Sequence, residues 1–175
     1  MGDSTLIINH LAQSRGISLD DGLTPIETAR DQALQGMLEE RLYWYMVYDR
    51  WLGDGWPFMS EKAFGHMSTP FRQIVKAIAL RAVRRMLWVQ GTARHTPGEI
   101  QSMAERDIAA LAEIVGDGPY VHGAQMRAID AVVYAFVYNL TLIKMDTPMI
   151  RAARTHANLV AYAERITREY FPEVA

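Results

Sequence analysis

The chain has 175 residues and a formal net charge of −2, with half of its residues hydrophobic and 22% charged. This length fits one compact domain, and the charge leaves no basic excess that would pair with the phosphates of a nucleic acid. The sequence contains no cysteine, which excludes disulfides, thiolate metal sites and a cysteine nucleophile. We therefore predict a cytoplasmic protein without a nucleic-acid partner. We also predict no membrane span, because the longest apolar stretch, residues 128–143, is shorter than the ~20 residues that a bilayer requires.

The first half of the chain predicts two helices separated by a loop over residues 17–23. The first covers residues 4–14 and ends at Gly16. The second begins at Thr24, which is followed by Pro25 and, three residues after the cap, by Glu27. No stop signal follows until Gly53, so this helix reaches about 40 Å at ~1.5 Å per residue. Such a helix is longer than one small core can cover, and we expect it to line a second domain or a dimer surface.

The second half predicts further helices and no strands, because no stretch alternates with period two. A short helical turn is expected within residues 56–65. Longer helices are expected over residues 70–89, 97–115, 127–144 and 148–170, and all but the third begin or end at Pro or Gly signals. Residues 127–144 are apolar on all sides and should form a buried helix. The fold class predicted is therefore an all-α, multi-helix bundle.

The most unusual segment, residues 41–51, places five tyrosines and tryptophans in three helical turns. Such side chains combine an apolar body with a polar tip, which suits a cleft for a small semi-polar ligand. We assign Glu40, Tyr43, Trp44 and Tyr48 to this substrate pocket. The structural alternative is that one face of the segment is core and the other is an interface.

Three arginines complete the predicted substrate pocket. Arg81 and Arg85 lie one turn apart at the edge of an apolar stripe, where a half-buried pair of guanidinium groups can grip a carboxylate. Alternatively their stems cover the core and their charges pair with acids of a neighbouring helix. Arg94, in a loop, can meet an anion, or it can hydrogen-bond to the last carbonyls of the preceding helix, which we favour. The stripe consists of Ile74, Ile78, Ala82, Met86 and Val89.

Other polar residues favour structural roles. The five histidines show no metal-ligand spacing, so we predict no metal site. Asp130 stands near the start of the apolar helix and is expected to act as a structural cap that accepts hydrogen bonds from first-turn N–H groups.

Two runs of residues resemble a known family. Residues 118–123 (GPYVHG) and 130–136 (DAVVYAF) look like the late helices of the glutathione S-transferase C-terminal domain, where an aromatic turn precedes a buried helix with an early Asp. Within that superfamily the chain most resembles the failed axon connections and metaxin-like branch. Further pieces of the resemblance are Asp3-Ser4, Tyr48-Asp49-Arg50-Trp51, Gln90-Gly91, Arg94-His95 and Tyr170-Phe171-Pro172. One departure is Arg127, where the family has a Ser or Thr cap.

The resemblance implies a division of the chain into residues 1–16, a remnant last helix of a thioredoxin-like domain, and residues 17–175, the helical domain. It implies that the rest of the thioredoxin-like N-terminal domain is missing and that Met1 is an internal methionine of a longer reading frame. In the family, residues equivalent to Asp3 and Ser4 hold the γ-glutamyl end of glutathione. We therefore expect no cofactor in this chain and glutathione as the ligand of a complete protein.

Two functions follow from the resemblance. The first is a glutathione transferase-like helical domain that lines an apolar substrate pocket, forms a homodimer and is incomplete for catalysis on its own. The alternative is a non-enzymatic protein-interaction module of the metaxin and failed axon connections type, which would use the aromatic helix as a docking surface.

Overall fold

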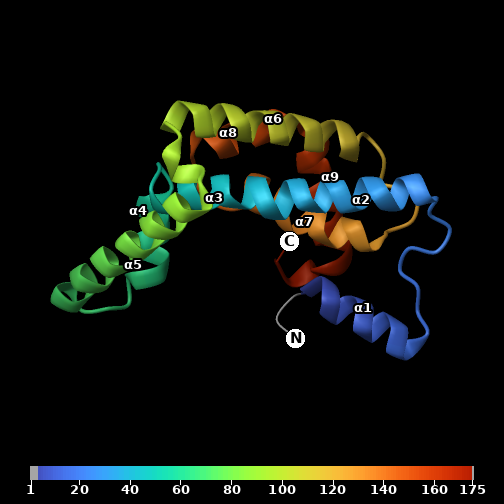
Figure 1. Ribbon diagram of the computed structural model, residues 1–175, viewed down its shortest axis with the longest axis horizontal. Helices are drawn as coiled ribbons and strands as arrows, with labels where there is room; N and C mark the ends of the chain where they lie inside the picture. The colour runs from blue at the N-terminus through green and yellow to red at the C-terminus, as the bar shows by residue number, and fades with distance from the viewer. Residues whose placement is uncertain (1–3, 175) are drawn as a thin grey trace.

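A computed structural model describes residues 4–174, and within that range every regular element is helical. Figure 1 shows their arrangement. In chain order the elements are α1 (Ser4–Arg15), α2 (Pro25–Met37), the π-turn η1 (Leu38–Leu42), α3 (Tyr43–Trp51), α4 (Trp56–Phe64), α5 (Thr69–Gln90), the 3₁₀ turn η2 (Thr92–Arg94), α6 (Pro97–Val115), α7 (Ala128–Thr141), α8 (Pro148–Arg154), α9 (Ala157–Tyr170) and the 3₁₀ turn η3 (Pro172–Val174). The prediction of an all-α fold is confirmed. No helix within residues 4–174 is both long and apolar enough to cross a bilayer.

The core of the bundle is built around α7. Its residues Val133, Val137 and Leu140 are almost completely buried among side chains of α2, α6, α8 and α9. Helix α6 covers one side of this core, and the continuous α2–η1–α3 helix covers another (Figure 1). Residues 128–141 therefore form the buried helix expected from their uniform hydrophobicity.

Two threonines cap the starts of their helices, at Thr24 where the sequence predicted it and at Thr96. The backbone N–H of Thr24 donates to Glu27 at 2.7 Å, and the Glu27 N–H donates to the Thr24 hydroxyl at 3.3 Å. Thr96 and Glu99 repeat this reciprocal pair at the start of α6. Each pair satisfies N–H groups that have no partner inside the helix. The starts of α2 and α6 are therefore confirmed.

The helix predicted over residues 24–52 is continuous but contains the π-turn η1. A π-turn inserts one residue into the helical repeat, so the faces before and after it are not in α-helical register. Leu38 and Leu42 lie at its ends and are fully buried. The turn thereby keeps the apolar face of α2 and that of α3 on the same core.

Helices α4 and α5 form an arm that projects from the bundle (Figure 1). A tight turn at Gly53–Gly55 leads into it; a Cβ on Gly55 would lie 2.9 Å from the Met145 sulfur and 3.0 Å from the Asp49 carbonyl oxygen. At its root the rings of Trp51, Trp56 and Phe64 pack together, with centroids 5.7 to 6.4 Å apart. The arm is thus fixed to α3 by aromatic contacts.

Along α5 itself only Leu87 is buried. The apolar stripe predicted on this helix exists, but Ile74, Ile78 and Val89 are exposed rather than packed on a core. The expectation that Arg81 and Arg85 are half-buried at the edge of a core face is corrected by the same observation, because both are exposed. The projection of the arm away from the bundle is the physical reason.

The helix predicted over residues 148–170 is divided into α8 and α9 at Thr155 and His156. The hydroxyl of Thr155 donates to the Ala152 carbonyl at 2.7 Å, and His156 adopts an extended conformation. The break has no Gly or Pro to announce it, which is why the pattern indicated one helix.

Candidate functional site: a histidine cleft beside α2

One face of α2 carries two carboxylates one turn apart, Glu27 and Asp31. Glu27 also belongs to the Thr24 capping pair, so its position is fixed by the start of the helix. The hydrogen bonds that Thr24 donates lower the pKa of Glu27. Burial raises the pKa of Asp31, and the hydrogen bond from His122 works in the opposite direction.

The loop over residues 116–127 brings His122 against this face. Tyr120 and Gly123 exchange two backbone hydrogen bonds of 3.1 Å, which closes a tight turn around His122. Gly123 has φ 88°, a left-handed conformation that residues with a Cβ seldom adopt. The turn is therefore built into the local sequence.

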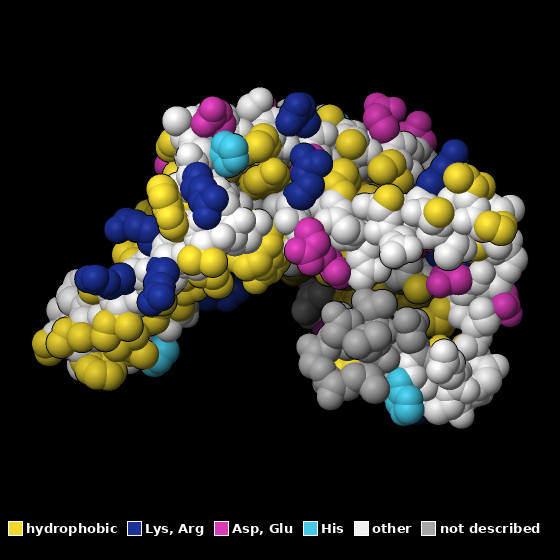
Figure 2. All heavy atoms as spheres, in the orientation of Figure 1, with side chains coloured by type: hydrophobic (Ala, Val, Ile, Leu, Met, Phe, Trp, Pro, Cys, Tyr) yellow, Lys and Arg dark blue, Asp and Glu magenta, His cyan; other side chains and the backbone are white. Residues whose placement is uncertain are grey.

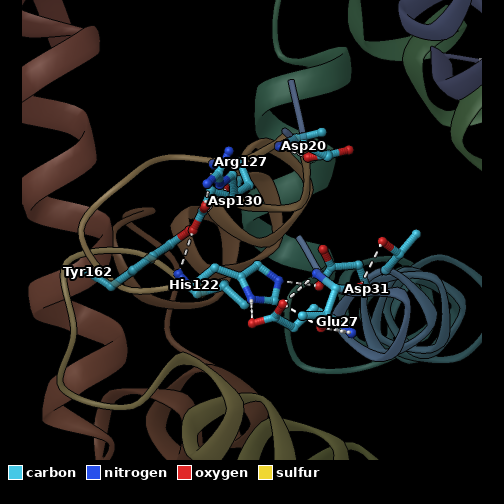
Figure 3. A network of polar contacts seen from close by, with 11 residues as sticks. Asp20, Glu27, Asp31, His122, Arg127, Asp130 and Tyr162 are labelled. Carbon is cyan, nitrogen blue, oxygen red and sulfur yellow. Dashed lines mark hydrogen bonds and ion pairs between the residues drawn. The ribbon is translucent and has the colours of Figure 1, made fainter. Parts of the chain in front are cut away.

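Asp130 anchors the loop to α7 (Figure 3). Its Oδ1 accepts hydrogen bonds from the Val121 N–H at 2.9 Å and from the Tyr162 hydroxyl at 2.8 Å, and its Oδ2 accepts from the Arg127 N–H at 2.9 Å. Asp130 is completely buried. Through one carboxylate the start of α7, the His122 loop and α9 are held together.

Desolvation raises the pKa of Tyr162 in this network, and the neighbouring Asp130 charge acts in the same direction. The hydroxyl therefore keeps its proton and donates a hydrogen bond to the carboxylate of Asp130. On the other side of the α7 start, the Ala128 N–H donates to Asp20 at 3.1 Å. The loop that precedes α2 thus also contributes to this end of the bundle.

His122 itself lies between the two carboxylates of α2. Its Nε2 is 2.7 Å from Asp31 Oδ1, and its Nδ1 is 3.9 Å from Glu27 Oε1 (Figure 3). When Asp31 is ionised, Nε2 carries a hydrogen and donates a hydrogen bond to the Asp31 carboxylate. The 3.9 Å separation is too long for a hydrogen bond, so Nδ1 remains able to bind an oxygen of a ligand.

An apolar wall adjoins the imidazole and completes a cleft of about 660 Å³. The wall comes from α2, from the end of α6 and from the loop, and the guanidinium of Arg30 adds a positive charge at the edge. The volume and the mixture of an apolar wall with a few polar groups are typical of small-molecule sites. The lining residues besides the histidine and the carboxylates are Arg30, Ala33, Leu34, Met37, Ile114 and Val121.

The residues assigned to the substrate pocket from sequence do not share one cavity. Tyr48 lines a separate cleft of about 330 Å³ between α3, the start of α6 and the start of α8. Glu40 and Tyr43 are exposed, and Trp44 is partly buried and contacts the Tyr43 ring edge-on at 5.1 Å. Their joint role in binding a substrate stays a prediction.

The three arginines lie elsewhere. Arg81 and Arg85 line a shallow groove along α5. The Nε of Arg94 donates to the Trp88 carbonyl at 3.1 Å, and its guanidinium lies over the Trp88 ring at 5.9 Å. Arg94 therefore makes the contact with the preceding helix that the structural alternative described.

The glutathione contact predicted for Asp3 and Ser4 also stays a prediction. Asp3 lies outside the described residues, and Ser4 begins α1. The division of the chain at residues 16 and 17 is likewise a prediction that the structure does not test. Among the residues described, no group of three or more His, Cys, Asp or Glu side chains is arranged to hold a metal ion.

A second buried carboxylate, Asp49, lies at the Tyr48 cleft. Its Oδ2 accepts a hydrogen bond from the Thr147 hydroxyl at 2.7 Å, and the Thr147 oxygen accepts from the Ile150 N–H at 3.3 Å. Burial raises the pKa of Asp49, while the Thr147 hydrogen bond opposes that shift. The pair joins α3 to the start of α8.

A bundle built on a buried central helix, with an acidic residue in the first turn of that helix, is the architecture of the glutathione S-transferase C-terminal domain. Residues 104–166 match the family model described as Glutathione S-transferase, C-terminal domain. Residues 1–56 match the one described as Glutathione S-transferase N-terminal domain. Both stretches of the chain are thus similar to domains of the glutathione S-transferase superfamily.

Two relatives match nearly the whole chain. An Isoprene-epoxide--glutathione S-transferase of Rhodococcus sp. (strain AD45) is 29% identical over 97% of this chain and 73% of its own length. Failed axon connections of Drosophila melanogaster is 25% identical over 99% of this chain, which spans only 44% of that relative. No solved structure matches at comparable significance.

The match over residues 1–56 corrects one prediction. The N-terminal domain was expected to be missing except for its last helix, and the family match contradicts this. The described part of the matched stretch is helical and includes α1, α2 and α3. The domain was expected to be missing because the sequence predicted no strands of a thioredoxin-like domain. The stretch nevertheless matches the N-terminal family, and its described part contains no strands.

Proposed function

We propose that the His122 cleft binds the electrophilic co-substrate of a glutathione transferase reaction, a small apolar molecule with one reactive oxygen, such as an epoxide. The observation that carries the proposal is the position of His122: an imidazole held by Asp31 lies beside the apolar wall formed by Leu34 and Met37. The relative named for isoprene epoxide and glutathione supports this class of substrate.

The chemistry suits such a site. The sulfur of glutathione would form a bond to an epoxide carbon, the C–O bond would break, and the freed oxygen would take up a proton. With both ring nitrogens protonated, His122 can donate a hydrogen bond or a proton to that oxygen from Nδ1, while Asp31 orients the ring and stabilises its positive charge. The thiol proton of glutathione, which is released as the C–S bond forms, replaces the proton that His122 gives to the oxygen. The apolar wall would hold the hydrocarbon part of the substrate.

The test measures binding and conjugation separately, with a small epoxide and glutathione. His122→Gln keeps a donor for Asp31 but removes the imidazole, and we expect kcat/KM to fall by about a hundredfold. His95→Gln is the matched control, because His95 is exposed and does not line the cleft. Unchanged conjugation in the first variant, at unchanged stability, would remove His122 from the reaction.

A second variant keeps the test decisive if His122→Gln loosens the loop. Ile114 lines the cleft and is partly exposed, so Ile114→Trp should fill the cleft without a void or clash in the core. We expect it to weaken epoxide binding while the thermal midpoint stays unchanged. Ile26→Trp, on an exposed position outside the cleft, is its control. Equal binding by the two variants would place the substrate elsewhere.

The proposal includes a homodimer. Exposed apolar side chains lie on the long helix, at Ile26 and Tyr43, and on α1, at Ile7, Ile8 and Leu11. Apolar surface of this kind favours association. Light scattering at tens of micromolar checks the proposal, and a monomer there would contradict it.

The alternative of a docking surface on the aromatic segment has weaker support. Tyr45 is buried in the core, and Trp51 packs on Trp56 and Phe64 within the chain. These contacts occupy the aromatic faces that a partner would need and leave Tyr43 as the exposed ring of that segment.

A further inference from the structure

The charges of the chain are distributed unevenly. Residues 56–94, which comprise α4, α5 and η2, hold seven of the 18 Lys and Arg residues but only one of the 20 Asp and Glu residues. This arm therefore carries a formal charge of +6, and the rest of the chain carries −8. The near-neutral total conceals a strongly basic arm on an acidic bundle. Figure 2 shows basic side chains and no acidic ones along the visible face of α5.

The basic residues of α5 accompany an exposed apolar stripe. Ile78 is 65% exposed and Val89 is 70% exposed, with Phe71 and Ile74 on the same side of the helix. At about 100° per residue, Arg81 and Arg85 flank this stripe, and Arg84 lies beyond them. All three arginines are exposed. None has a carboxylate partner among the ion pairs of the described residues.

The combination favours one kind of partner. A surface that binds only charge, such as a nucleic acid, gains nothing from the exposed isoleucines. A basic helix with an apolar stripe lies well in the interface of a bilayer, where the stripe enters the acyl boundary and the arginines reach anionic headgroups. The arm is also held away from the acidic bundle, so α5 can approach a flat negative surface without the bundle's repulsion.

We propose that α5 docks the protein on an anionic lipid membrane, lying along the surface without crossing it. The root of the arm supports this role. Lys76 contacts the Ser60 hydroxyl at 3.3 Å and lies over the Trp56 ring at 6.0 Å. The aromatic cluster at Trp51 holds the base, so α5 presents its stripe already folded.

The experiment is flotation of the full chain with vesicles of phosphatidylcholine alone, or of phosphatidylcholine and phosphatidylserine at about two to one. We expect binding to the mixed vesicles only, and a decline in binding as salt screens the charges. Arg81→Gln with Arg85→Gln should weaken partitioning by about twenty-five-fold, since each basic residue near the surface contributes a factor of about five. The control is Arg106→Gln with Arg168→Gln, which removes the same charge from exposed positions in α6 and α9.

A second pair of variants tests the contribution of the apolar stripe to vesicle binding. Ile78→Glu should abolish vesicle binding, whereas Ile17→Glu, at an exposed isoleucine in the loop before α2, should leave it unchanged. Neither position is buried, so both variants should remain folded.

Three results would overturn the proposal: no binding to the mixed vesicles at low salt, equal binding by Ile78→Glu and the wild type, or dispersal of a dimer in solution by Ile78→Glu. The last result would assign the stripe to a second copy of the chain. A wild-type chain that binds an acidic soluble protein but no vesicle would assign it to a protein partner. All of these readouts are independent of epoxide conjugation.

Discussion

Helices α7 and α5 both carry apolar faces, and these faces have opposite fates in the fold. In α7, Val133 and Val137 are completely buried, and Asp130 satisfies donors from three elements. In α5, Leu87 is buried and the stripe through Ile78 faces outward. A helical apolar period locates a face but does not say what covers it. The two helices also differ in charge: α7 has one charged residue, Asp130 in its first turn, whereas α5 has cations over most of its length.

The first prediction concerns the polar anchor of α7. Asp130→Ala removes the acceptor for the Val121 and Arg127 N–H groups and for the Tyr162 hydroxyl. Buried donors left without partners are costly, and we expect a loss of at least about 3 kcal/mol in the free energy of unfolding. Urea denaturation of the variant and the wild type measures this loss. A loss below about 1 kcal/mol would mean that the network reorganises around the gap.

The second prediction compares the two apolar faces directly. Leu140→Ala empties a site that is 1% exposed and should cost about 2 to 5 kcal/mol. Ile78→Ala removes a similar side chain from α5 and should change stability by less than about 0.5 kcal/mol. Comparable losses would show that the stripe on α5 packs against something in the free protein.

The third prediction compares how the helices begin. The Thr96 hydroxyl accepts from the Glu99 N–H in α6, whereas Ser68 makes no side-chain cap hydrogen bond in α5. Thr96→Ala should therefore cost about 1 kcal/mol, and Ser68→Ala should cost a few tenths at most. Thermal unfolding of both variants checks this, and a larger effect at Ser68 would reverse the comparison.

The smallest effect that we expect is a pH-dependent change in stability caused by Asp49, which lies where the arm joins the bundle. Because burial raises the pKa of Asp49 above its ordinary value of 3.8, the folded state binds a proton more readily than the unfolded chain. Ionised Asp49 therefore lowers stability at neutral pH, and this cost disappears as the pH falls through the folded pKa toward the unfolded one. The Thr147 hydroxyl reduces the cost.

The test of this sign is Asp49→Asn, which cannot ionise. We expect its stability relative to the wild type to be greatest near neutral pH and to decline as the pH is lowered. A stability difference that does not vary with pH would show that Asp49 has the same pKa in both states.

Much of the fold could be predicted from local signals. Thr24 and Thr96 announce their helices because a cap, a proline and a glutamate act within one turn, and α7 is recognisable from its hydrophobicity alone. The π-turn at residues 38–42 and the break at His156 were missed, since both arise from packing and carry no Gly or Pro signal.

The candidate site was much harder to predict. Asp31 and His122 are 91 residues apart, and neither belongs to a motif whose spacing implies the pair. The available signal was indirect: Glu27 and Asp31 share a face of α2, and His122 stands in the turn that the family resemblance had already singled out. The arginines of α5 were recognised, but their exposure depends on where the arm projects.

The absence of native cysteine makes a direct test of the central contrast available. Single-cysteine variants Ile78→Cys and Val137→Cys can be treated with a thiol reagent, and their rates compared with those in denaturant. We predict that the thiol at position 78 reacts almost as fast in the folded chain as in the unfolded one, and that the thiol at position 137 reacts only through unfolding. Protection at position 78 comparable to that at position 137, in dilute protein without lipid, would contradict an exposed α5 face.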